Sequence, residues 1–217
     1  MHSLTEENYL KAIYHLSKKE VPRITPTALA DEMSINAASV VDMIKKLSEK
    51  KLISYDKKNG ANLTTKGKNI ALDVVRKHRL WEVFLSEKLG YTWDVVHEIA
   101  EQLEHIRHHE LADRLDKFLG HPKYDPHGDP IPNSKGEVPA TADTLLSEIE
   151  EGNTCRVTAV KDTSAIFLQY LEQLSVSIGT KILVLEKIPF DGSIVVKIEK
   201  NPKTTVSEKF AENLLVS

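Results

Sequence analysis

The sequence predicts a mainly α-helical chain that ends in a small β domain. Apolar residues recur at helical spacing through most of the first 119 positions, whereas short β-prone runs predominate from position 155 onward. Between these regions, residues 121–139 are rich in Pro, Gly and Asp, a composition typical of a loop or linker. A chain of 217 residues is also long for one compact domain. We therefore expect a domain boundary in this segment.

The composition is that of an ordinary folded protein. Hydrophobic residues make up 41% of the chain and charged residues 28%, which excludes disordered and collagen-like classes. No apolar run approaches the roughly 18 residues of a membrane span, and the first residues lack the basic start and apolar core of a signal peptide. Cys155 is the single cysteine, so an intrachain disulfide is excluded. We expect a cytoplasmic protein.

Charge is distributed unevenly along the chain. The first 80 residues carry 15 Lys and Arg against 9 Asp and Glu, whereas the remainder carries 14 against 23. A basic segment joined to an acidic one indicates a polyanionic partner for the first. The alternative is that these charges are only the solvated faces of ordinary helices.

The first 50 residues predict three helices. Ser3 and Glu6 have the spacing of a capping box, which starts a helix that continues to about Lys19. Thr25-Pro26 opens a second helix over 27–33, and a tight connection leads into a third over 37–50. The order is helix, helix, turn, helix.

Two short β-prone runs at 52–55 and 61–64 follow, joined by a lysine-rich tip that contains Asn59-Gly60. A helix-turn-helix followed by such a hairpin is a winged helix-turn-helix, which lays its third helix in the major groove while cationic groups contact phosphates. Double-stranded DNA is the expected partner, and a winged helix used only for protein contacts is the alternative. The expected DNA-binding residues are Thr27, Asn36, Ala38, Ser39, Asp42, Lys45, Lys46, Lys57 and Lys58.

The rest of the chain predicts further helices and then the β domain. A long helix is expected from about Lys68 to Leu89, before Gly90, followed by helices at 93–105 and 108–119. The β-prone runs lie at 155–160, 181–185, 193–198 and 213–216, with a helix at 165–174. A small β-barrel of about 75 residues fits this count.

One constellation of side chains indicates a metal site. On a helix, Glu101, Glu104 and His105 share one face because positions three and four apart are neighbours; His97 precedes them, and His78 and Glu82 form another such pair. Imidazole and carboxylate ligands without a thiolate favour Mn(II) or Fe(II) over softer metals. The alternative for any one of these histidines is an ordinary surface or core residue.

Three motifs occur in one order along the chain: Val75-Arg76-Lys77-His78-Arg79-Leu80-x-Glu82, Val96-His97-Glu98-x-Ala100-Glu101-x-x-Glu104-His105, and His127-Gly128-x-Pro130-Ile131-Pro132. Together they resemble the metal-dependent transcriptional repressors typified by the diphtheria toxin repressor and its manganese-sensing relatives. The resemblance implies a homodimer that binds a palindromic operator. It also implies a winged helix-turn-helix domain at 1–72, a helical metal-binding and dimerisation domain with linker at 73–140, and an SH3-like (FeoA-like) β-barrel at 141–217.

The resemblance also implies two metal sites. The regulatory site maps onto Asn8, Glu101, Glu104 and His105, and the second onto His78, Glu82 and His97, with Asp162 as a further ligand. Glu101 stands where iron-sensing members have Cys, which resembles the manganese-responsive branch. Asn8 departs from the family's Met or Asp, so the alternative is a contact made through Glu7 or Lys11.

The family's anion site maps onto Arg79, but here Asp125 and Asp129 replace small polar residues. Because two carboxylates repel an anion, we expect an Arg79 salt bridge, or acidic ligation of a metal, in its place.

Two other functions remain open on the sequence alone. A metallohydrolase would need an open coordination position and a base beside a substrate pocket, which nothing in the sequence marks. A metal-independent winged-helix regulator would carry His78, Glu82 and Glu101 as surface charges.

Overall fold

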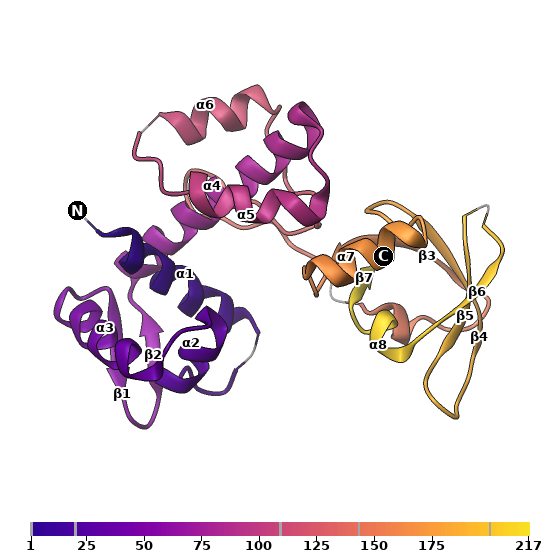
Figure 1. Ribbon diagram of the computed structural model, residues 1–217, viewed down its shortest axis with the longest axis horizontal. Helices are drawn as coiled ribbons and strands as arrows, with labels where there is room; N and C mark the ends of the chain where they lie inside the picture. Colours follow the sequence, from indigo (N-terminus) through magenta and orange to yellow (C-terminus); the bar gives the residue numbers. More distant parts are fainter. Residues whose placement is uncertain (1, 20, 109, 143, 200) are drawn as a thin grey trace. The chain divides into compact units, whose positions relative to one another are not determined.

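The computed structural model describes residues 2–19, 21–108, 110–142, 144–199 and 201–217 (Figure 1). The chain divides into two compact units. Unit 1 comprises residues 1–78, 103–112 and 132–137, and unit 2 comprises residues 79–102, 113–131 and 138–217.

Unit 1 contains the predicted winged helix-turn-helix. Its elements are α1 (Leu4–Lys18), α2 (Pro26–Met33), α3 (Ala37–Glu49), β1 (Ile53–Asp56), β2 (Gly60–Leu63) and the first part of α4 (Thr65–Leu89). The capping signals act as predicted, because Ser3 forms a capping box with Glu6 and Thr25 accepts a hydrogen bond from the Ala28 N–H at 3.1 Å. At the wing, Gly60 has φ +74°, and a Cβ there would lie 2.6 Å from the Ile24 carbonyl oxygen, so the tip requires glycine.

Buried aliphatic side chains from each helix form the core of unit 1. Leu10 and Ile13 of α1, Leu29 of α2, and Val40 and Leu47 of α3 are fully buried. This packing buries one face of α3, which contacts α2 and β1, and leaves the opposite face of α3 exposed.

Unit 2 contains the rest of α4, α5 (Trp93–Leu103) except its last residue, most of α6 (Leu111–Phe118) and the β domain. The predicted helix over 93–105 was too long: α5 ends at Leu103, and Glu104 and His105 lie in the turn that follows. That turn breaks the common helical face on which the three ligand positions were expected to lie.

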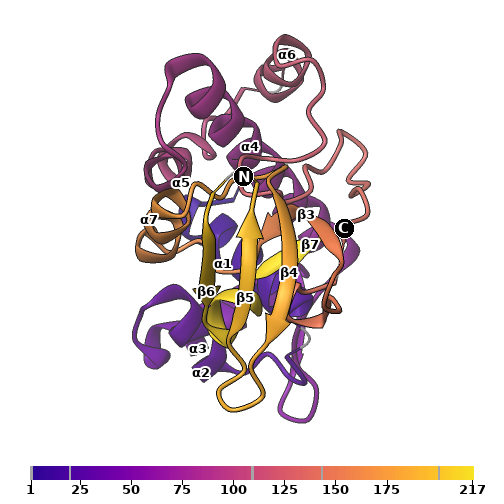
Figure 2. The ribbon, with the colours of Figure 1, turned by 90° about the vertical axis from the view of Figure 1, so that its right-hand side faces the viewer.

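A five-stranded antiparallel sheet in the order β6-β5-β4-β3-β7 forms the β domain, and Figure 2 shows β6, β5 and β4 side by side. Its hydrophobic core includes Leu168, Ile182, Val196 and Phe210. The predicted fold class, mainly α with a small β domain, is confirmed. The elements are η1 (Leu146–Glu148), β3 (Thr154–Val160), α7 (Ala165–Gln173), β4 (Lys181–Lys187), β5 (Ile194–Ile198), β6 (Lys203–Val206), α8 (Glu208–Ala211) and β7 (Leu214–Val216).

Glu6 is a buried anion that joins the first turn of α1 to the end of α3. Its Oε1 accepts a hydrogen bond from Lys50 Nζ at 2.7 Å and lies 3.0 Å from Lys46 Nζ. Burial would raise the pKa of Glu6, but the hydrogen bonds with Lys50, Lys46 and Ser3 lower it to about 2 from the ordinary 4.5.

Because the pKa of Glu6 is lower in the folded than in the unfolded chain, its contribution to stability is complete above pH 4.5 and is lost as the pH falls to about 2. We expect Glu6→Gln to lower the free energy of unfolding by about 3 kcal/mol at pH 7. Below pH 4.5, the free energy of unfolding of this variant should fall less steeply with decreasing pH than that of the wild type. Urea unfolding at several pH values measures both effects, with the exposed Glu49→Gln as control. An unchanged acid profile in Glu6→Gln would contradict this assignment.

Candidate metal-binding sites

A first cluster of titratable groups in unit 1 surrounds the fully buried Glu104. Lys11 Nζ donates hydrogen bonds to Glu104 Oε1 at 2.7 Å and to Oε2 at 2.9 Å. His78 Nδ1 lies 2.6 Å from Oε2, and His105 Nε2 lies 3.4 Å from Oε1. We call Glu7, Lys11, His78, Glu104 and His105 the Glu104 cluster.

Helix α1 contributes two side chains to this cluster. Glu7 Oε2 lies 2.7 Å from His105 Nδ1, and Lys11, one turn later, reaches Glu104. The winged unit is thus tied to the turn after α5 by contacts between residues more than 90 positions apart. Glu7 and Lys11 were named from the sequence only as alternatives to Asn8.

Asn8 provides the test of whether a metal fits here. Its Oδ1 is buried and, among the residues described, has no hydrogen-bond partner. A buried amide oxygen without a donor is costly unless water or a cation satisfies it. An amide oxygen such as that of Asn8, the carboxylate of Glu104 and the imidazole of His105 are donor types that suit Mn(II) or Fe(II).

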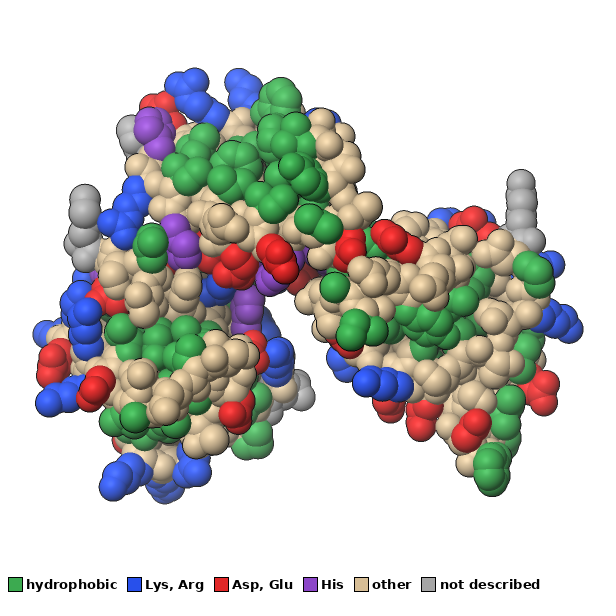
Figure 3. Space-filling view, viewed as in Figure 1, with side chains coloured by type: hydrophobic (Ala, Val, Ile, Leu, Met, Phe, Trp, Pro, Cys, Tyr) green, Lys and Arg blue, Asp and Glu red, His purple; other side chains and the backbone are tan. Residues whose placement is uncertain are grey.

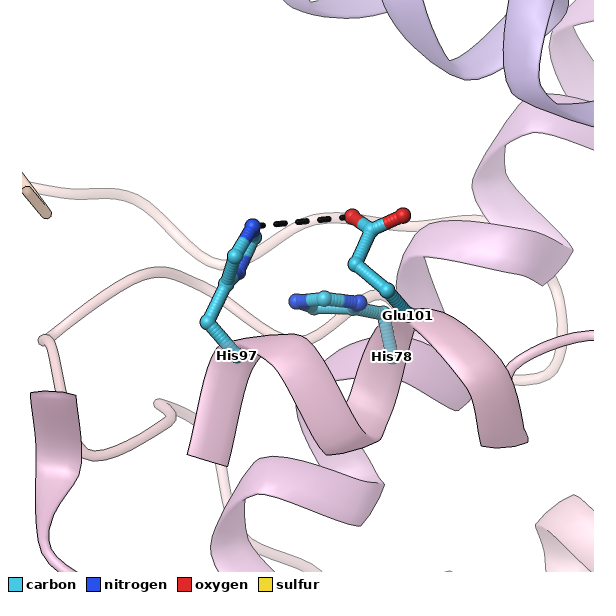
Figure 4. Close-up of side chains that lie close together, drawn as sticks. All are labelled: His78, His97 and Glu101. Atoms are coloured by element: carbon cyan, nitrogen blue, oxygen red, sulfur yellow. Dashed lines mark ion pairs between the residues drawn. The ribbon is translucent and has the colours of Figure 1, made fainter. Parts of the chain in front are cut away.

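Glu101 and His97 belong to unit 2, where α5 carries both. His97 Nε2 lies 3.6 Å from Glu101 Oε1, the ion pair drawn in Figure 4, and His97 Nδ1 lies 3.4 Å from Glu82 Oε1. Figure 4 also draws His78, which projects from α4. The sequence placed His78 in the second metal site, and the structure gives it a contact with Glu104 in unit 1.

A second group of ligands in unit 2 consists of Glu82, Asp125 and His127, all buried, with ligand atoms within 4.8 Å of one another. His127 Nδ1 lies 3.8 Å from Glu82 Oε1 and 4.0 Å from Asp125 Oδ1. His127 Nε2 lies 2.9 Å from the carbonyl oxygen of Trp93. An Nε2–H donated to that carbonyl leaves Nδ1 directed at the two carboxylates, the arrangement that orients a metal-ligating histidine.

Electrostatics in this second group favour a cation. Burial raises the pKa of Asp125 well above its ordinary value, as do the charges of Glu82 and Asp129, while Arg79 and His127 oppose the shift. Burial lowers the pKa of His127, but the hydrogen bond with Glu82 and the charges of Glu82 and Asp125 raise it to about 9. Without a metal, His127 is therefore an imidazolium at neutral pH, and one positive charge already lies among the carboxylates.

Sequence reasoning missed His127 as a potential ligand, and it named Asp125 only through acidic ligation of a metal as the alternative to an Arg79 salt bridge. Their signal was the pairing of Asp125 and His127 around one proline in a loop, next to the motif His127-Gly128. Asp162, the predicted further ligand, accepts a hydrogen bond from the Ser164 N–H at 2.8 Å in the loop before α7. Of the residues described, neither group of potential ligands includes Asp162.

Arg79 forms the salt bridges expected in place of an anion site. Its Nη2 lies 3.2 Å from Asp129 Oδ2, its Nε lies 3.6 Å from Asp125 Oδ2, and its Nη1 donates to the Pro130 carbonyl oxygen. The salt-bridge prediction is confirmed, and Arg79 neutralises part of the charge around Asp125.

The predicted DNA-binding residues are all exposed in unit 1, and Figure 3 shows Lys and Arg side chains around the end of this unit that carries the wing. Two of them also use their side chains in structural contacts. Asn36 Oδ1 caps α3 by accepting the Ala38 N–H at 2.8 Å, and Lys46 pairs with Glu6. The remaining seven are Thr27, Ala38, Ser39, Asp42, Lys45, Lys57 and Lys58.

Three family models match consecutive parts of the chain. Residues 1–61 match the N-terminal DNA-binding domain of iron-dependent repressors, residues 64–133 match their metal-binding and dimerisation domain, and residues 144–217 match the FeoA domain.

Individual relatives agree with these models. The chain is 28% identical over 147 residues to the diphtheria toxin repressor of Corynebacterium jeikeium, covering 68% of this chain and 61% of that protein. It is 33% identical over 128 residues to the iron-dependent repressor IdeR of Mycobacterium leprae, covering 59% and 55%. The chain thus spans less than two thirds of the length of these two relatives.

A solved structure matches over nearly the whole chain. A manganese-dependent transcriptional repressor in complex with manganese superposes with a TM-score of 0.87 at 33% identity, covering 97% of this chain and 98% of that one. With the three family models, this match shows that the chain belongs to the iron-dependent repressor family typified by the diphtheria toxin repressor.

Proposed function

We propose that this chain is a DNA-binding transcriptional repressor of metal homeostasis that Mn(II) or Fe(II) activates. The observation that carries this proposal is the Glu104 cluster, because it ties α1 of the winged unit to a turn that holds Glu104 and His105. The manganese complex of the solved relative supports the same metal class. Family membership in a group of repressors removes the metallohydrolase alternative.

The regulatory site is proposed on Asn8, Glu104 and His105 of unit 1, whereas Glu101 stays a prediction of the family resemblance. A divalent ion held there supplies binding energy that is specific to the arrangement with α1 fixed, and so raises the population of that arrangement. Glu104 and His105 contact side chains of α1, and the buried Oδ1 of Asn8 is a further potential ligand on that helix.

A second metal site is proposed on Glu82, Asp125 and His127, with His97 beside Glu82. It adds a buried cation in unit 2, where Asp125 also pairs with Arg79. Asp162 stays a prediction of the family resemblance.

Metal binding at the second site is expected to displace the proton of His127. Because the pKa of His127 is about 9 and the pKa of Asp125 is raised above its ordinary value, the affinity for Mn(II) should rise steeply with pH from pH 6 and level off near pH 9. Calorimetry in buffers of different ionisation enthalpy counts the protons released. If no proton leaves at pH 7, His127 is not a ligand in that site.

A homodimer on a palindromic operator is the proposed assembly. Unit 2 exposes large apolar side chains, including Phe118 at 65%, and Figure 3 shows hydrophobic side chains gathered over its helical part. Phe118 lies against Phe84, whose ring centroid is 6.2 Å away. An exposed apolar surface of this kind is typical of a protein interface.

Location and domain division complete the proposal. Across the ranges described, the structure has no helix with the length and apolarity needed to cross a membrane. The proposed location is the cytoplasm, where a repressor would meet its DNA, and the proposed division remains 1–72, 73–140 and 141–217.

The test is DNA binding with and without a chelator. We expect a selected palindromic operator to be bound at least about 100-fold more tightly with Mn(II) than with chelator, a coupling at the upper end of those measured between sites. Metal-free protein that binds the operator with undiminished affinity would instead support a metal-independent winged-helix regulator.

A further inference from the structure

Lys11 is a buried ammonium group inside the proposed regulatory site. The residue is 8% exposed, and Nζ lies within 3 Å of both oxygens of Glu104. Lysine is almost never buried unless it is paired. The pair therefore places a fixed positive charge directly on a proposed metal ligand.

Both oxygens of Glu104 already have partners in this arrangement. Oε1 is contacted by Lys11 and His105, and Oε2 by Lys11 and His78. A divalent ion that binds Glu104 must therefore move Lys11 from at least one oxygen, or lie close to an ammonium that repels it. Either event weakens metal binding relative to a site without the lysine.

From this geometry we infer that Lys11 is an internal competitor of the metal and sets the metal concentration at which the regulatory site fills. In the metal-free chain its ammonium neutralises Glu104. A bound metal ion would neutralise Glu104 in place of Lys11. Repulsion by the nearby ammonium of Lys11 would raise the dissociation constant of the metal ion. This inference rests on the proposed function, because it requires Glu104 to be a metal ligand.

The test is calorimetric titration of the full chain with Mn(II). Lys11→Met removes the charge and keeps an unbranched chain, and Lys11→Gln also keeps a hydrogen-bond donor for Glu104. We expect both variants to bind Mn(II) at least about tenfold more tightly in the step that depends on Glu104, because a neighbouring charge shifts ionic equilibria by one to three log units. Lys18→Met, an exposed lysine on the same helix, should leave the dissociation constant unchanged.

A second measurement applies if the metal-free variants are less stable. Mn(II) should raise the melting temperature of Lys11→Met and Lys11→Gln by more than that of the wild type, because only the metal neutralises Glu104 in these variants. Equal or weaker Mn(II) binding together with an equal or smaller rise in melting temperature would overturn the inference.

The outcomes also separate this inference from the proposed function. If Glu104→Gln binds Mn(II) as the wild type does, then Glu104 is not a ligand and the proposed regulatory site is wrong. If Glu104→Gln loses one Mn(II) binding step but the Lys11 variants bind Mn(II) no more tightly in that step, the proposed regulatory site stands. In that case only the inferred competition between Lys11 and the metal is wrong.

Discussion

Replacing Glu104 with Gln is expected to abolish metal-activated DNA binding and to lower the free energy of unfolding of the metal-free chain by about 3 to 5 kcal/mol. The variant keeps the shape of the side chain but leaves the buried ammonium of Lys11 opposite a neutral amide. Breaking a buried ion pair from one side costs more than the pair contributes, because the remaining charge is desolvated without compensation. Urea unfolding in the presence of chelator measures this cost.

Two comparisons make the Glu104 result specific. Glu98→Gln, an exposed carboxylate on α5, should change stability by no more than about 0.5 kcal/mol. The double variant Lys11→Met with Glu104→Gln should recover part of the loss, because it removes both charges. If the single variant unfolds at the same urea concentration as the wild type, the Lys11–Glu104 pair does not hold α1 in solution.

Local signals explain which parts of the fold could be predicted. Ser3, Thr25 and Asn36 each cap a helix through a backbone N–H two or three residues away, so their effect is visible in a short window of sequence. Strand β6 was missed because Lys203–Val206 is a short, half-polar run. It becomes a strand at the sheet edge by pairing with β5.

The candidate sites show a different limit. Helical spacing drew attention to Glu104 and His105, although α5 ends before them. Their partners Glu7 and Lys11 lie more than 90 residues earlier, and the pairing depends on how α1 packs against the turn. Asp125 shows the same limit, because its role depends on a loop whose path only tertiary packing determines.

Gly128 is the residue that lets this loop lie against the β domain. It has φ +87°, and a Cβ there would lie 2.1 Å from the Thr158 carbonyl oxygen and 2.5 Å from Ala159 Cα, both backbone atoms of β3. The preceding residue, His127, accepts the Val160 N–H at 3.0 Å through its own carbonyl oxygen. The position of the His127 ring therefore depends on close approach of two backbones in unit 2.

We expect Gly128→Ala to lower the free energy of unfolding by about 3 kcal/mol or more, the sum of a left-handed backbone cost and a clash that backbone atoms cannot relieve cheaply. The displaced loop should also move His127 away from Glu82 and Asp125. The Mn(II) binding step that releases a proton should then be absent from the calorimetric titration. Gly120→Ala is the matched control: it has φ +78° with nothing within 4 Å of the added Cβ, so only the backbone cost of about 1 to 2 kcal/mol applies. Equal destabilisation of the two variants would show that the loop does not approach β3 so closely in solution. The position of His127 in the proposed second metal site would then not depend on Gly128.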